Sequence, residues 1–325
     1  MQHRPRRNRR SAAIRDLVRQ HRLTSSDLIL PAFVQEGSDL VTPIAAMPGV
    51  ARHSIDRLCD HAAEAWAAGI RALALFPKID DDLKDSRATA SAQADNLLCR
   101  ALQAVKEQLP ELVLITDVAM DPYSSDGHDG LVADGAILND ETLPILAAMA
   151  VNQAQAGADV VAPSDMMDGR VGAIRQALDQ DGHDQVLICS YCTKYASAFY
   201  GPFRSALDSA PRGGDKCSYQ MDPANRREAV REIAADEAEG ADWLMVKPGL
   251  PYLDIVADMR RQTVLPIAAY HVSGEYAMLH AAAERGWLDY EACLLESLLC
   301  FRRAGADMIL SYGALDAARA LAAGR

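Results

Sequence analysis

Short aliphatic runs alternate along the chain with longer amphipathic stretches. The stretches are rich in alanine, and several end in glycine just before the next run, as helices commonly do. Clear examples are 54–69, 141–157, 225–240 and 290–305. The runs have the length and residue content of buried strands. Eight of them are found, at 28–34, 70–76, 112–118, 159–163, 186–190, 243–247, 266–270 and 307–312.

Eight strand and helix repeats within 325 residues favour a closed (β/α)₈ barrel. An open, doubly wound sheet is less well supported, because the chain has no G-x-G-x-x-G motif or Walker loop. We therefore predict an α/β protein, with an extended basic N-terminal arm (1–25) before one catalytic TIM barrel (26–325). Active sites of such barrels lie at the C-terminal ends of the strands. Residues that end or follow the apolar runs are thus the candidates for chemistry.

Two lysines stand at such positions. Lys194 follows the apolar run that begins at residue 186, and Lys247 ends the next run. A lysine has a pKa of ~10.4 and becomes a good nucleophile only when burial or a second cation lowers that value. Two amines in one pocket therefore suggest chemistry on carbonyl groups, whereas a single lysine is more often exposed at the surface. Further polar residues at strand ends are Asp117, Ser164, Asp165, Tyr270, Ser273 and Tyr312.

The segment after Lys194 is unusually aromatic for a chain with only five phenylalanines. We expect Tyr200, Gly201 and Pro202 to prevent helix formation there, and we predict a mobile lid (195–216) over the barrel mouth. A lid would exclude water from an imine intermediate. The alternative is an ordinary packed loop.

The loop after the third predicted strand, 117–130, contains four aspartates and one histidine. Carboxylates in a glycine-containing loop suit a hard cation such as Mg²⁺, and no cysteine is available there for zinc. The residues alone favour a solvated acidic loop equally well.

Charge is distributed unevenly along the chain. The net charge is −12, and because the first 22 residues carry +7, the rest carries −19. A body this acidic is not expected to bind nucleic acid, and the basic arm is either a disordered tail or a docking arm. Seven cysteines without regular spacing fit a reducing compartment. No uncharged run reaches the ~18 residues of a membrane span, and we expect a cytoplasmic protein without a membrane partner.

Several motifs together resemble the 5-aminolevulinate dehydratase (porphobilinogen synthase) family. They run from the arm to the last strand and are RPRRNRR, LILPAFVQEG, VAPSDMMDGRV, SYCTKYASAFYGPFR, YQMDPANRREA and MVKPGLPYLDI. The resemblance implies that the chain condenses two 5-aminolevulinate molecules to porphobilinogen with loss of two waters, early in haem and tetrapyrrole synthesis. It also implies that Lys194 and Lys247 both form Schiff bases with substrate. We expect Asp117 and Tyr270 to assist the proton transfers.

The resemblance extends to the substrate carboxylates. Arg204, Lys216 and Gln220 match positions that bind the carboxylate of one substrate, and Ser273 and Tyr312 match those for the other. Family members often have arginine where this chain has Lys216.

The resemblance also bears on metals. Zinc-dependent members carry three cysteines at positions matching Ala119, Asp121 and Asp129, so this chain resembles the aspartate-rich members that use Mg²⁺ or a monovalent cation, and no zinc is expected. Asp121 and Asp129 are then candidate ligands, although some members need no active-site metal. Glu232 matches the ligand of a separate Mg²⁺ site near the arm. Family members form homo-octamers with arms around neighbouring barrels, an arrangement that the basic arm and acidic body would suit.

Two other functions remain open. A class I aldolase on the same fold would also form a Schiff base, but normally on one lysine. A non-enzymatic assembly or binding protein on a degenerate barrel would be expected to lack the lysines or the lid. The identity of the metal, octamer against hexamer, and the substrate held by each lysine are not decided.

Overall fold

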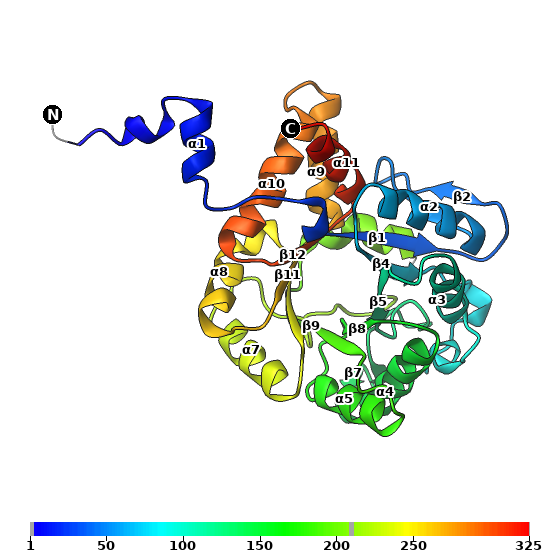
Figure 1. Cartoon of the computed structure of the whole chain (residues 1–325). Helices are drawn as coiled ribbons and strands as arrows, with labels where there is room; N and C mark the ends of the chain where they lie inside the picture. The colour runs from blue at the N-terminus through cyan, green and yellow to red at the C-terminus, as the bar shows by residue number, and fades with distance from the viewer. Residues whose placement is uncertain (1–2, 208–210, 325) are drawn as a thin grey trace.

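Eight parallel strands close into a barrel (Figure 1). The computed structural model describes residues 3–207 and 211–324. Around the barrel the order is β1, β4, β5, β8, β9, β10, β11 and β12, and β12 pairs with β1. The predicted fold class is confirmed. The strands are β1 (Leu28–Val34), β4 (Ala72–Pro77), β5 (Val113–Val118), β8 (Val160–Pro163), β9 (Leu187–Lys194), β10 (Trp243–Lys247), β11 (Ile267–His271) and β12 (Met308–Ser311).

Helices form an outer ring around the strands (Figure 1). Their apolar faces and the outward side chains of the strands make one buried layer, and the inward side chains fill the barrel. Parallel strands buried on both faces read as continuous apolar runs, which is why they could be recognised in the sequence. The helices are α2 (Ile55–Ala67), α3 (Leu97–Gln108), α4 (Asn139–Gln155), α5 (Arg170–Gln180), α6 (Gly201–Leu207), α7 (Glu228–Ala238), α8 (Leu253–Gln262), α9 (Ser273–Glu284), α10 (Tyr290–Ala304) and α11 (Ala314–Ala322).

Two hairpins and the N-terminal arm are added to the barrel. The hairpin β2 (Val41–Pro43) and β3 (Ala51–His53) extends the sheet beyond β1. A second hairpin, β6 (Leu131–Ala133) and β7 (Ala136–Leu138), follows the aspartate-rich loop. The N-terminal arm carries η1 (Pro5–Arg9) and α1 (Ala12–Val18) and stands clear of the barrel in Figure 1. Within the described residues, no helix is both long and apolar enough to cross a membrane.

Strand β9 is longer than predicted and contains a β-bulge. Along β10, Leu244 and Val246 are two residues apart, but their partners Ser190 and Thr193 on β9 are three apart. One extra residue in a strand reverses which face the following side chains occupy. The reversal places Lys194 on the same inward face as its register partner, Lys247.

The lid segment contains helix, so the predicted absence of helix there was wrong. A 3₁₀ turn, η5 (Ala198–Tyr200), leads directly into α6. Gly201 begins that helix and Pro202 lies in its first turn, where a missing backbone N–H costs no hydrogen bond. Residues 208–210 of the predicted lid lie outside the described residues.

Candidate active site

The two lysines lie side by side at the C-terminal ends of β9 and β10. Lys194 is 5% exposed and Lys247 6%, so neither is a surface lysine. Aromatic rings surround the Lys247 amine: Nζ lies 4.9, 5.4, 5.2 and 4.8 Å from the ring centroids of Tyr191, Tyr200, Phe203 and Tyr270. The strand register has thus brought two amines into one water-poor pocket.

The electrostatics of this pocket favour a neutral amine on Lys247. Burial lowers the pKa of Lys247 to about 7, the positive charge of Lys194 acts in the same direction, and Asp117 opposes both. A substantial fraction of Lys247 is therefore the free base at neutral pH. That form is the nucleophile required for attack on a ketone.

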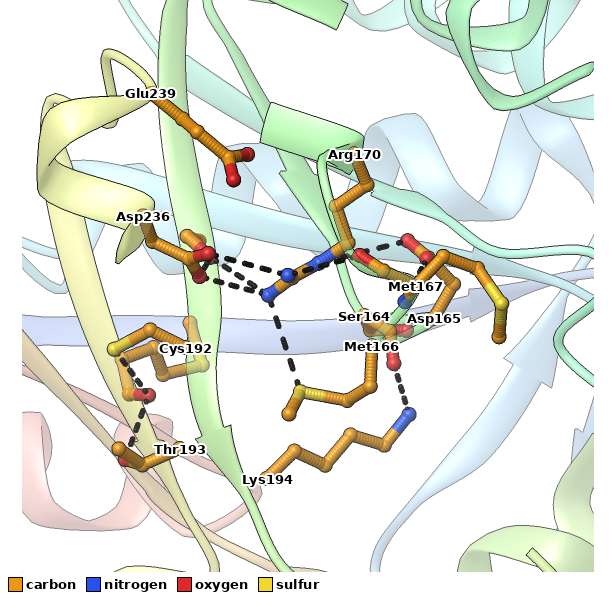
Figure 2. Close-up of polar contacts among 12 residues, drawn as sticks. Ser164, Asp165, Met166, Met167, Arg170, Cys192, Thr193, Lys194, Asp236 and Glu239 are labelled. Atoms are coloured by element: carbon orange, nitrogen blue, oxygen red, sulfur yellow. Dashed lines mark hydrogen bonds and ion pairs between the residues drawn. The ribbon is translucent and has the colours of Figure 1, made fainter. Parts of the chain in front are cut away.

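Lys194 and Asp117 occupy the same pocket from neighbouring strands. The Lys194 ammonium donates a hydrogen bond to the backbone oxygen of Ser164, at the end of β8 (Figure 2). Burial raises the pKa of Asp117, although both lysines act against this. Among the described residues, Asp117 Oδ1 is buried without a hydrogen-bond partner. Asp117 is thus placed to exchange a proton with a bound substrate.

Two tyrosines and a serine lie at the C-terminal ends of β11 and β12. The Tyr270 and Tyr312 hydroxyl oxygens lie 2.9 Å apart in a hydrogen bond. The Ser273 hydroxyl accepts from the Phe203 backbone N–H at 3.0 Å and donates to the Phe199 carbonyl at 3.4 Å. Ser273, predicted to bind a substrate carboxylate, here contacts the lid.

The lid is docked onto the barrel. The Tyr200 hydroxyl lies 2.8 Å from the carbonyl oxygen of Tyr195 and 3.1 Å from that of Lys247. A Cβ at Gly274 would lie 2.5 Å from the Phe199 carbonyl oxygen, so a glycine is needed for this close approach. The docked lid covers the lysine pocket and excludes water from it.

Lys216 lies between two carboxylates of the aspartate-rich loop. Its Nζ donates to Asp121 Oδ2 at 3.1 Å and to Asp129 Oδ2 at 3.0 Å. Burial disfavours the charged lysine, but the two carboxylates together raise the pKa of Lys216 above its ordinary value. The family resemblance made these aspartates candidate ligands of a metal cation, and in the structure an ammonium group lies beside them.

The donor groups at this position fit an ammonium ion better than a metal. Asp121 and Asp129 supply two carboxylates, and Lys216 already takes one oxygen of each. No group of three or more His, Cys, Asp or Glu side chains within 3–207 and 211–324 could hold a metal ion. Glu232 lies on α7, half-buried beside Asp236 and apart from the lysine pocket, and burial raises its pKa.

The remaining predicted residues lie on the lid and next to it. Gln220 is 4% exposed, and no described residue bonds its Oε1 atom. Arg204 is partly exposed on α6. Among the described residues, no side-chain hydrogen bond or ion pair joins either of them to the two lysines.

Two residues at the site were assigned no role from the sequence. Glu275 is buried, and its carboxylate accepts from Leu250 N at 2.7 Å and Val272 N at 2.8 Å, joining the turns that follow β10 and β11. His128 forms hydrogen bonds with Gly213 O, in the lid, at 2.8 Å and with Tyr219 Oη, just after the lid, at 3.1 Å. An acidic residue in a first helical turn signals a helix start, but no local pattern reveals a bridge between two loops.

Comparisons with known proteins point to one family. The family model described as delta-aminolevulinic acid dehydratase matches residues 2–320. The chloroplastic delta-aminolevulinic acid dehydratase of Chlamydomonas reinhardtii is 54% identical over 98% of this chain and 84% of its own length. The Bradyrhizobium diazoefficiens enzyme is 53% identical over 98% of this chain and 90% of its own.

A solved structure is similar over nearly the whole fold. It is the delta-aminolevulinic acid dehydratase (porphobilinogen synthase) of Toxoplasma gondii ME49, in complex with the reaction product porphobilinogen. Its TM-score is 0.97 at 54% sequence identity, and the match covers 98% of this chain and 91% of that one.

Proposed function

The chain belongs to the delta-aminolevulinic acid dehydratase family, and from that premise we propose which of its residues carry the reaction. The reaction condenses two 5-aminolevulinate molecules to porphobilinogen with loss of two waters, a step of tetrapyrrole synthesis, and the enzyme is a hydro-lyase. One observation carries the assignment of residues. Two buried lysines are register partners, and the pKa of Lys247 is about 7.

In this proposal each lysine holds one substrate as an imine. The free amine of Lys247 attacks the ketone of the substrate that becomes the acetate side, and the ketone oxygen leaves as water. Lys194 forms the second imine and releases the second water. One imine becomes an enamine by losing a proton, and its carbon attacks the other imine to form the carbon–carbon bond. The lysine on the attacked carbon then leaves as an amine, while the neighbouring carbon loses a proton to form a carbon–carbon double bond. The substrate amino group then displaces the remaining lysine, and proton loss completes the pyrrole ring.

The other residues bind substrate and move protons. Asp117 and Tyr270 exchange protons with the intermediates, supported by their burial in the same pocket. Arg204, Lys216 and Gln220 bind one carboxylate, and Ser273 with Tyr312 binds the other. Because Lys216 is paired with Asp121 and Asp129, an incoming carboxylate has to compete for its ammonium group.

Borohydride trapping tests the proposal and separates it from a class I aldolase. Borohydride reduces an imine to a stable amine, so treatment with 5-aminolevulinate should leave adducts on both Lys194 and Lys247, each located by peptide mass spectrometry. An adduct on a single lysine would favour an aldolase. No adduct on either would remove the proposal, and it would reopen the non-enzymatic alternative.

The pH dependence of imine formation at Lys247 is a sharper prediction. The neutral fraction of its amine rises as pH increases through about 7, so the trapping rate at Lys247 should rise over the same interval. In Lys194→Met the second positive charge is gone, the pKa of Lys247 should increase, and the midpoint should move to higher pH. Trapping is the appropriate readout because this variant cannot turn over. An unchanged midpoint would show that Lys194 does not activate Lys247.

For metals we propose that Lys216 supplies the positive charge beside Asp121 and Asp129, and that Mg²⁺ acts at Glu232 in assembly. Exhaustive chelation should then leave the trapping of both imines intact. Any activity that is lost should fall together with the size of the oligomer, followed by light scattering, and Mg²⁺ should restore both. Rescue of turnover by Zn²⁺ alone, with the oligomer unchanged, would contradict this arrangement, and so would a K⁺ requirement for trapping.

We further propose a homo-octamer held by the arms and located in the cytoplasm. The support is the +7 charge of the first 22 residues against an acidic barrel, and the exposure of Leu17 (84%) and Val18 (52%) on the arm. Native mass spectrometry of the full chain and of a chain lacking residues 1–25 should give octamers and smaller species respectively. Cell fractionation addresses the compartment, because relatives include proteins named chloroplastic.

A further inference from the structure

A buried arginine lies behind the Lys194 side of the pocket. Arg170, the first residue of α5, is 2% exposed. Its Nη1 and Nη2 atoms donate to the two carboxylate oxygens of Asp236 at 3.2 and 2.8 Å, and Nη2 also donates to Ser190 Oγ at 3.0 Å. The guanidinium therefore links α7 to the middle of β9. Figure 2 shows the Arg170 guanidinium between Asp236 on one side and the loop 164–167 on the other.

The same guanidinium holds the loop that follows β8. Nη1 donates to the Met167 carbonyl at 3.3 Å, and Nε lies 3.9 Å from Asp165 Oδ2. Asp165 in turn accepts from Met167 N at 2.7 Å through its other oxygen. Burial raises the pKa of Asp165 to about 7, against the pull of Arg170. These three contacts join Arg170, Asp165 and Met167, and they hold residues 165–167 between the barrel and α5.

The backbone of this loop is strained at its centre. Met166 has φ of +69°, in the left-handed region that residues other than glycine seldom occupy. Such a conformation persists only where its surroundings hold it, and it is often found at functional sites. The strain therefore has to be held by the contacts of Arg170 and Asp165 on either side.

The loop also carries the acceptor of Lys194. The Ser164 carbonyl receives the hydrogen bond from Lys194 Nζ, and Ser164 precedes Asp165 directly (Figure 2). Ser190, which accepts a hydrogen bond from Arg170, lies four residues before Lys194 on the same strand. Arg170 thus holds both the strand that carries Lys194 and the loop that receives its amine.

We propose that Arg170 is a positioning residue for Lys194: it holds the strained loop 164–167 so that the Ser164 carbonyl aims the Lys194 amine at the second substrate. The inference rests on the proposed function, because it concerns the imine that Lys194 forms with the second substrate. Only this imine is expected to depend on Arg170. Lysine cannot replace Arg170, because a single ammonium does not reproduce a fork that reaches Asp236, Ser190 and the Met167 carbonyl together.

The test is differential trapping of the two imines in Arg170→Lys. This variant keeps the buried positive charge that Asp236 needs. A displacement of ~1 Å at a reacting group costs about 100-fold, so we expect the Lys194 adduct and kcat to fall by about that factor. The Lys247 adduct should stay within about twofold of wild type, with little change in KM. Arg175→Met, on the same helix and bonded instead to Asp179 and Val186, is the control that should leave both adducts unchanged.

Asp165→Asn provides a second variant that buries no new charge. It keeps the oxygen that accepts from Met167 N but loses the attraction to Arg170, so the Lys194 adduct should fall selectively and by a smaller factor. Equal adducts on Lys194 in wild type and both variants would overturn the inference and leave the proposed function standing. A parallel fall of both adducts would also overturn it, since that indicates general damage. Absence of both adducts in the wild-type enzyme would instead remove the proposed function.

Discussion

Replacing Lys247 with alanine is expected to abolish porphobilinogen formation while the barrel remains folded. Without the amine no imine forms at this position, and neither Lys194 nor a tyrosine can take its place, because the register puts Lys247 inside the aromatic cage. Loss of a covalent nucleophile typically reduces turnover by ~10⁴-fold or more. Activity should be measured as porphobilinogen released per hour, with circular dichroism as the measure of folding.

The fold should tolerate this change because a buried lysine of lowered pKa contributes little stability. Between about pH 7 and 10.5 the unfolded chain binds more protons at Lys247 than the folded chain, so this lysine opposes folding most at low pH and least at high pH. Lys106→Ala, on the outer helix α3, is a matched control that should retain turnover. Substantial turnover in Lys247→Ala would refute the proposed role of this residue.

Replacing Lys216 with methionine is expected to open the lid at its aspartate contacts. The change leaves Asp121 and Asp129 buried and facing each other without a cation, and breaking such a pair costs ~3–5 kcal/mol. Hydrogen exchange of the amides at 211–219 should report this loss as a lower free energy of local opening. Turnover should fall as well, through a higher KM, since Lys216 also binds a substrate carboxylate in the proposed function.

The effect of Lys216→Met should depend on pH in a defined direction. In the wild type the folded pKa of Lys216 is raised, so its contribution is fully present below the pKa of the unfolded lysine and is lost only as pH rises through the folded value. In the variant the loss should be greatest near pH 8 and smaller near pH 5, where one carboxylate can take a proton. Lys216→Arg should keep the ion pair and most of the protection. Equal protection in wild type and Lys216→Met at both values of pH would contradict the role of this pair.

The strands could be predicted from the sequence, because strands buried on both faces appear as continuous apolar runs. β10 was predicted at its observed bounds, and the lysine that ends it lies at the barrel mouth. The inward direction of Lys194 was not predictable, since it depends on a bulge that two neighbouring strands define together. The pairing of Lys216 with two aspartates depends on how a distant segment folds back over the mouth. Arg170 was not a candidate from the sequence, and only packing reveals that it is buried.

The bulge in β9 makes the enzyme depend on how a strand pairs as well as on its residues. Regular alternation with the same number of residues would put Thr193 opposite Lys247 and turn the second amine toward the helices, with each catalytic side chain still encoded. A relative that lost the bulge without losing a residue would score as intact in any comparison of residue identities, yet it would have one amine in the pocket. The bulge in this strand therefore separates a two-lysine catalyst from a single-lysine one.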